Sequence, residues 1–159
     1  MSLKKSGKAP AMFAGERVNM NEEIKFGTVE EATQFAFNEA VRGLNSQNWE
    51  RCEEDDECRW NVGRPGFHCA VGWLIPEDNQ TEGRTGSVSD LIVMKEEGKE
   101  ESVLYANYHE WLGNDRFDRF LEHMQNAHDV NAPSMKKRFL LLGQNHKLEW
   151  PDDVSPIIQ

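Results

Sequence analysis

Three cysteines that lie close together in the sequence are the residues with the most distinctive chemistry. Cys52, Cys58 and Cys69 fall within 18 residues, and His68 places an imidazole beside the last of them. Three thiols and one imidazole could bind a tetrahedral zinc ion. The spacing argues against such a site, because zinc ligands usually come in pairs on one tight turn and neither Cys-x5-Cys nor an adjacent His-Cys pair fits that pattern. We therefore predict no metal site and no cofactor.

A reactive thiol is the second chemistry that these residues allow. Cys69 precedes the apolar segment 70–75, and the positive end of a helical turn there would favour the thiolate. His128 lies far downstream on an apolar helix face and could act as the base. A small thiol-dependent hydrolase or transferase that uses Cys69 and His128 is therefore one candidate function. In the competing interpretation both residues belong to the core, since free cysteine is among the most buried residue types.

A binding surface is the third interpretation of the same region. Tryptophan and arginine are the residues most enriched at the energetic centres of interfaces, and an arginine beside an aromatic ring can also hold a nucleotide. Six of the eight residues at 50–57 are acidic, which is typical of a solvated loop. The candidate binding residues are Arg59, Trp60, Arg64, Trp73, Glu53, Glu54, Asp55 and Asp56.

Composition and missing motifs exclude several classes of function. The chain has 159 residues, 38% of them hydrophobic, and a formal net charge of −10. An acidic protein repels the phosphates of nucleic acid, so general DNA or RNA binding is disfavoured, whereas a basic protein surface would be attracted. No apolar run approaches the length of a membrane span, and no apolar stretch typical of a signal peptide follows the first lysines. We also find no Walker loop, Gly-x-Ser-x-Gly or His-Glu-x-x-His motif.

Five segments of the sequence are predicted to form helices. The best defined begins at Thr28, which would form a capping box with Glu31, and extends to Gln47. A second strong amphipathic pattern runs from Phe117 to His128. The remaining predicted helices cover residues 87–94 and 103–112 and a final segment that starts at Pro133.

A small β-hairpin is predicted between the first two of these helices. Residues 58–62 and 67–70 alternate between apolar and polar types, and a Gly/Pro-rich turn at 63–66 separates them. The apolar segment 70–75 is either the end of the second strand or a buried helical turn. The expected fold class is therefore α+β and mainly α, with about five short helices packed with one hairpin.

The expected domain organisation is one globular unit with two tails. Residues 1–25 lack apolar periodicity, and their basic character contrasts with the acidic rest of the chain, so we predict a mobile basic tail. Residues 26–150 would form the single globular domain, and residues 151–159 a C-terminal tail that can fold back. The sequence leaves the oligomeric state open.

The centre of the chain resembles a loose group of small uncharacterised proteins encoded in phage and bacterial genomes. The resemblance rests on residues 58–60, 69–72 and 74–78, which read CRW, CAVG and LIPED, and it extends to LEHMQNAHD at 121–129. It implies a phage or bacterial origin, a cytoplasmic location and an accessory role. The expected function is binding of a host protein or a small ligand, with inhibition or modulation of a host system as its purpose.

Overall fold

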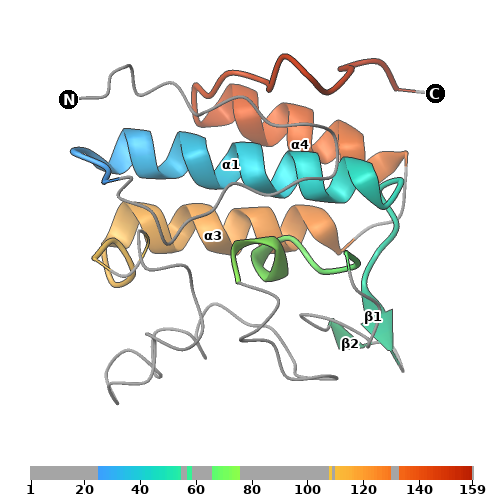
Figure 1. Ribbon diagram of the computed structural model, residues 1–159, viewed down its shortest axis with the longest axis horizontal. Helices are drawn as coiled ribbons and strands as arrows, with labels where there is room; N and C mark the ends of the chain where they lie inside the picture. The colour runs from blue at the N-terminus through green and yellow to red at the C-terminus, as the bar shows by residue number, and fades with distance from the viewer. Residues whose placement is uncertain are drawn as a thin grey trace.

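Three α-helices dominate the computed structural model, which describes residues 25–54, 57–58, 66–75, 108, 110–129 and 133–158. They are α1 (Val29–Ser46), α3 (Asp115–His128) and α4 (Ser134–Asn145), and a 3-10 helix, η1, covers Val71–Leu74. Helix α3 packs against both α1 and α4, and η1 packs against α1 and α3. Figure 1 shows that α1 and α3 run in the same direction and that α4 runs back.

The helices begin where local capping chemistry places their ends. The Thr28 hydroxyl accepts a hydrogen bond from the Glu31 backbone N–H at 3.2 Å, and the Glu31 carboxylate accepts one from the Gly27 N–H at 2.7 Å. The first of these bonds is one half of the predicted capping box, but Glu31 reaches the N–H of Gly27 and not that of the N-cap residue Thr28. Asn114 caps α3 in the same way, since its side-chain oxygen accepts from the N–H groups of the first turn.

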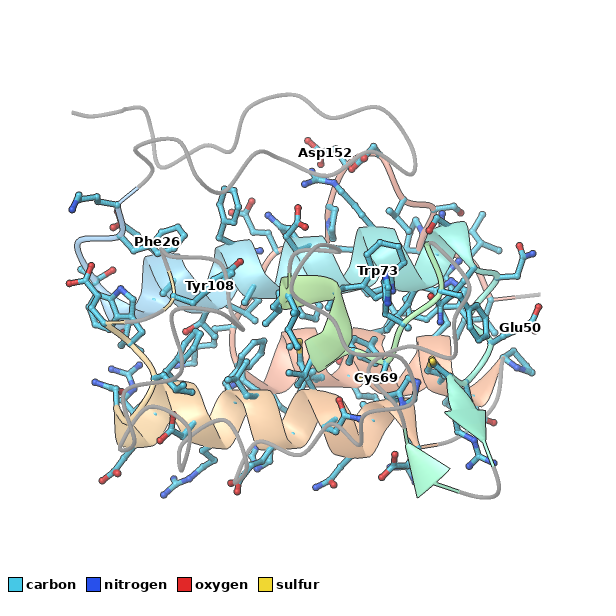
Figure 2. The ribbon with its side chains drawn as sticks, turned by 60° about the horizontal axis from the view of Figure 1, so that its bottom comes forward. Phe26, Glu50, Cys69, Trp73, Tyr108 and Asp152 are labelled. Atoms are coloured by element: carbon cyan, nitrogen blue, oxygen red, sulfur yellow. The ribbon has the colours of Figure 1, made fainter. Side chains whose placement is uncertain are left out.

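The core lies between α1 and the elements packed around it. Ten residues of the 18-residue helix α1 are buried, so this helix is covered on more than one side. Phe37 contacts the rings of Phe120 on α3 and Phe139 on α4, each with 6.4 Å between centroids. At the start of α1, Phe26 lies 5.7 Å from Tyr108, and Figure 2 shows this pair well apart from Trp73 and Cys69.

The predicted α+β class, with five helices and a β-hairpin, is wrong. The described part of the chain is helical, with three α-helices. Its only extended pairing is a two-residue antiparallel contact between β1 (Glu53–Glu54) and β2 (Glu57–Cys58), which is too short to form a sheet layer. Residues 67–70, expected as the second arm of the hairpin, form no strand. The helix expected at 87–94, and most of the one expected at 103–112, lie outside the described residues.

Residues 67–70 form no strand for a physical reason that involves a glutamine side chain, whereas residues 59–65 of the predicted hairpin lie outside the described ranges. All four residues at 67–70 are buried, so the alternation in the sequence does not correspond to a buried and a solvated face. The side-chain amide of Gln47 takes the place of a neighbouring strand, because it accepts from the His68 N–H at 3.0 Å and donates to the His68 carbonyl at 2.8 Å. Backbone groups that are satisfied in this way need no β-ladder.

The C-terminal segment is packed along α1. Gln34 exchanges two hydrogen bonds of 2.9 Å with the backbone of Glu149, and the Trp150 ring stacks on Trp49 with 6.2 Å between centroids. Arg42 binds both carboxylate oxygens of Asp153 at 2.9 and 3.0 Å. Residues 148–154 therefore belong to the folded unit. The predicted N-terminal tail lies outside the described residues apart from Lys25, and no helix in the described ranges is long and apolar enough to cross a membrane.

Candidate functional site

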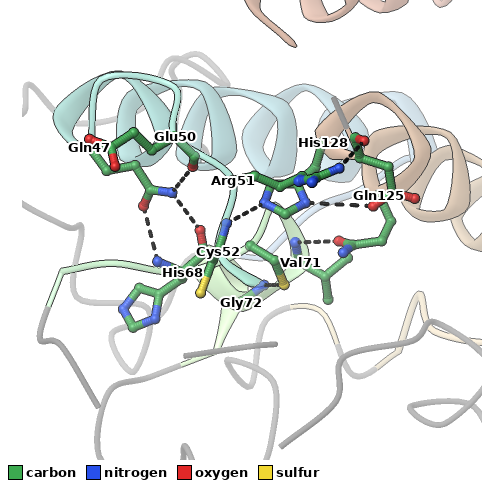
Figure 3. A network of polar contacts seen from close by, with 11 residues as sticks. Gln47, Glu50, Arg51, Cys52, His68, Val71, Gly72, Gln125 and His128 are labelled. Atoms are coloured by element: carbon green, nitrogen blue, oxygen red, sulfur yellow. Dashed lines mark hydrogen bonds and ion pairs between the residues drawn. The ribbon is translucent and has the colours of Figure 1, made fainter. Parts of the chain in front are cut away.

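Three of the sequence-predicted site residues, Cys69, Trp73 and His128, are described with their side chains, and they lie where the C-terminal ends of α1 and α3 meet the segment 66–75. The chain leaves α1 through Asn48 and Trp49, whose φ angles of 58° and 59° lie in the left-handed region. Such angles are unusual for a residue as bulky as tryptophan, and the burial of the Trp49 ring in the core holds it there. This sharp turn brings Cys52 back against α3, as Figure 3 shows.

His128 is completely buried and acts as a hydrogen-bond acceptor at one ring nitrogen. Its Nε2 accepts from the backbone N–H of Cys52 at 3.1 Å. A neutral imidazole that accepts at Nε2 carries its proton on Nδ1. Here Nδ1 lies 3.8 Å from a carboxylate oxygen of Asp129, the residue that follows the helix. The sequence had left two interpretations of His128 open, and this geometry matches a core histidine bonded to backbone.

The two described thiols are also core groups. Cys52 and Cys69 are both fully buried within the hydrophobic core. The Cys69 sulfur accepts from the Gly72 N–H at 3.3 Å, so the thiol closes the first turn of η1. The Cys52 thiol lies 3.7 Å from the Phe67 carbonyl.

The metal interpretation receives no support from the described geometry. Among the described residues, no group of three or more histidine, cysteine or acidic side chains is arranged to hold a metal ion. The His68 ring instead packs edge-on against Trp73, with 4.7 Å between centroids. Cys58, the remaining ligand of the predicted set, contributes only its backbone, in β2, to the described structure.

Most of the predicted binding residues fall outside the described part of the chain. Trp73 is the exception, and the structure places it in the core with 2% of its surface exposed. Its ring lies so close to Gly43 that any Cβ there would come within 2.1 Å of a ring carbon. This burial removes Trp73 from the expected surface. Arg59, Trp60, Arg64, Asp55 and Asp56 lie outside the described residues, and Glu53 and Glu54 are described only as the backbone of β1.

Two glutamines organise this region, and the sequence analysis did not identify either. All four hydrogen-bonding positions of the Gln47 amide are used: Oε1 accepts from the His68 N–H and the Trp73 indole, and Nε2 donates to the carbonyls of Glu50 and His68. Gln125 on α3 accepts from the Val71 N–H at 3.2 Å. No local signal marks these roles, because the partners of each side chain lie in distant segments.

Comparisons with known proteins add no assignment to this geometry. No protein family, curated protein or solved structure matches the chain.

Proposed function

We propose that this protein acts by binding a host protein or a small ligand, as an accessory protein of phage or bacterial origin, and not by thiol catalysis. The observation that carries the choice is the hydrogen bond from the Cys52 N–H to Nε2 of His128. The phage or bacterial origin and the accessory role rest on the sequence resemblance alone.

A thiol enzyme needs a base with an available lone pair and a thiol that a substrate can reach. The Nε2 lone pair of His128 already accepts the buried backbone N–H of Cys52. Protonation of Nε2 would place two hydrogen-bond donors opposite each other with no acceptor between them. Cys69 has no exposed surface, and its sulfur accepts from the backbone of η1. Chemistry at this pair would therefore require the core to open.

The charge of the chain supports binding of a partner with a basic surface. The sequence holds 28 acidic against 18 basic residues, and complementary charge accelerates and orients protein association. The acidic run at 50–57 concentrates part of this charge beside Arg59 and Trp60, residues of the types that dominate interface energetics.

Thiol reactivity separates binding from the catalytic alternative. In a Cys58→Ser background only Cys52 and Cys69 remain, and we expect neither to react with an aromatic disulfide reagent until denaturant unfolds the protein. A fast reaction of Cys69 in the native state, slowed by His128→Gln, would replace the binding proposal with the thiol enzyme.

Partner capture tests the binding role directly. The immobilised full-length protein is incubated with bacterial lysate, and the purified protein is examined by native mass spectrometry for retained small molecules. We expect one stoichiometric protein partner or one retained small molecule. A protein partner should be lost in Arg59→Ala/Trp60→Ala but kept in the control Arg138→Ala, which alters an exposed position on α4. Equal retention by both variants would contradict the proposed surface, and the absence of any retained species would contradict the binding role.

A further inference from the structure

A small pocket lies at the end of the helical bundle remote from Cys69 and His128. Figure 1 shows that the first turns of α1 and α3 and the last turn of α4 meet at this end. The cavity has a volume of about 230 Å³, and we call it the end pocket. Its lining residues are Glu30, Thr33, Arg116, Arg119, His146 and Leu148.

The end pocket brings two arginine side chains together. Arg116 and Arg119 come from the first two turns of α3, and the positive dipole ends of α1 and α3 lie here opposite the negative dipole end of α4. Within the described part of the chain, Arg119 has no ion-pair partner, so its guanidinium is available to a ligand. The first turns of α1 and α3 also carry the acidic residues Glu30, Glu31, Asp115 and Asp118, so affinity for an anion rests on direct contact with the two guanidinium groups and not on a positive field.

Glu30 shows that this end of the bundle already stabilises an anion. Its carboxylate pairs with the Arg116 guanidinium at 2.7 Å, and both side chains are about two-thirds exposed. The pKa of Glu30 is lowered, first by a hydrogen bond from its own backbone N–H at the start of α1 and then by Arg116. An anionic side chain of the protein thus occupies part of the position that a ligand would take.

His146 gives the pocket a polar group that is neutral at physiological pH. Its Nε2 lies 3.1 Å from Nδ1 of His123, so one of these two rings donates a hydrogen bond to the other. Burial, and then the neighbouring His123, lower the pKa of His146 below its ordinary value. The ring is held edge-on against Phe120, with 5.2 Å between centroids.

We propose that the end pocket binds the phosphate or sulfate group of a small molecule, with Arg116 and Arg119 as the donors and Glu30 as an internal competitor. Guanidinium groups match such oxyanions in geometry and charge. The volume is below the range of about 300–1,000 Å³ typical of drug-sized ligands, so the pocket fits one compact group. This inference rests on the proposed binding function and narrows it to a ligand class.

The net charge of the chain favours a small oxyanion over a nucleic acid strand. A polyanion would lie along the protein surface, where the formal charge of −10 repels it. A single phosphate or sulfate group inside the pocket contacts the arginines directly, and Glu30 is the acidic residue that lines the same pocket.

Titration of the full-length protein with inorganic sulfate and inorganic phosphate tests the proposal. The ionic strength is held constant with sodium chloride, and the Arg Nε–H signals are followed by NMR. We expect saturable shifts of Arg116 and Arg119 with both oxyanions and none with chloride. Arg119→Gln should weaken binding about tenfold, because a charge-assisted hydrogen bond is lost. Glu30→Gln should strengthen it about threefold, because a surface ion pair of modest energy no longer competes.

Each other outcome of this titration overturns the inference. The control Arg138→Gln removes an exposed positive charge on α4, outside the pocket, and should leave the affinity unchanged. An equal loss of oxyanion affinity in Arg138→Gln and Arg119→Gln would show that the oxyanion is attracted to any positive charge on the protein and does not bind specifically in the pocket. Weaker binding by Glu30→Gln, or no saturable shift, would also refute the site. If the titration fails but the thiols are unreactive and a partner is retained in the experiments described above, the end-pocket proposal is refuted and the proposed binding function is still supported.

Discussion

Replacement of His128 by leucine or glutamine separates its hydrogen bond from its packing. The imidazole is fully buried at the C-terminal end of α3, and Nε2 accepts the Cys52 N–H at 3.1 Å. His128→Leu keeps most of the volume but removes the acceptor, and a buried donor that loses its partner costs about 1–3 kcal/mol. In His128→Gln the amide oxygen can take the position of Nε2, so we expect a loss below about 1.5 kcal/mol.

Urea denaturation followed by far-UV circular dichroism measures these differences. With a slope of about 1–3 kcal/mol/M, a loss of about 2 kcal/mol moves the unfolding midpoint by roughly 1 M. His128→Ala should be the least stable variant, since it adds a cavity to the lost acceptor. Met124→Leu, one turn earlier on the same helix and equally buried, is the control for packing alone. The argument fails if the leucine variant is as stable as the wild type or more stable than the glutamine variant.

Three further predictions concern other parts of the structure. Gly43→Ala should destabilise the protein by about 3 kcal/mol or more in the same urea assay, because the added Cβ would lie 2.1 Å from Trp73; a change below about 0.5 kcal/mol would contradict this packing. Arg42→Ala and Asp153→Asn should each cost about 1 kcal/mol, and a double-mutant cycle should give less than their sum; full additivity would show that the pair is not coupled. Burial and the neighbouring His123 lower the pKa of His146, so sulfate affinity at the end pocket should stay flat from about pH 8 to about 6.5 and rise only below that, where protonation of His146 adds positive charge beside Arg116 and Arg119. The pKa of Glu30 is lowered from 4.5, so this residue stays charged down to that pH, and a profile that is flat as far as pH 4.5 would show that His146 does not face the anion.

Local signals in the sequence predicted the helices that the structure describes. Thr28 with Glu31 marks the start of α1 and Pro133 that of α4, and each marker acts within one turn of its own position. Capping of this kind depends on neighbouring residues alone, which is why a sequence reveals it. The helical spacing of the apolar residues up to His128 likewise predicted α3 from the sequence.

The hairpin prediction failed because alternation in a short segment has more than one structural cause. Residues 67–70 alternate in type, yet His68 is as buried as its neighbours, because its backbone pairs with the Gln47 amide and its ring packs on Trp73. A polar residue that is satisfied by a distant side chain cannot be distinguished, in one sequence, from a polar residue that faces water. The end pocket escaped prediction for the same reason, since its residues come from α1, α3 and the end of α4.

The position of a histidine lone pair decides whether a cysteine and a histidine in one region form a catalytic pair. Here α1 holds the segment 66–75 through Gln47 and through the close contact of Trp73 with Gly43. That attachment presses Cys69 against the backbone of η1 and leaves His128 facing the Cys52 amide. The thiol of Cys69 and the imidazole of His128, which the residue types suggested as a catalytic pair, therefore both form hydrogen bonds to backbone groups within the core. In the part of the chain that the structure describes, the end pocket instead presents charged groups to solvent, so the search for a ligand begins there.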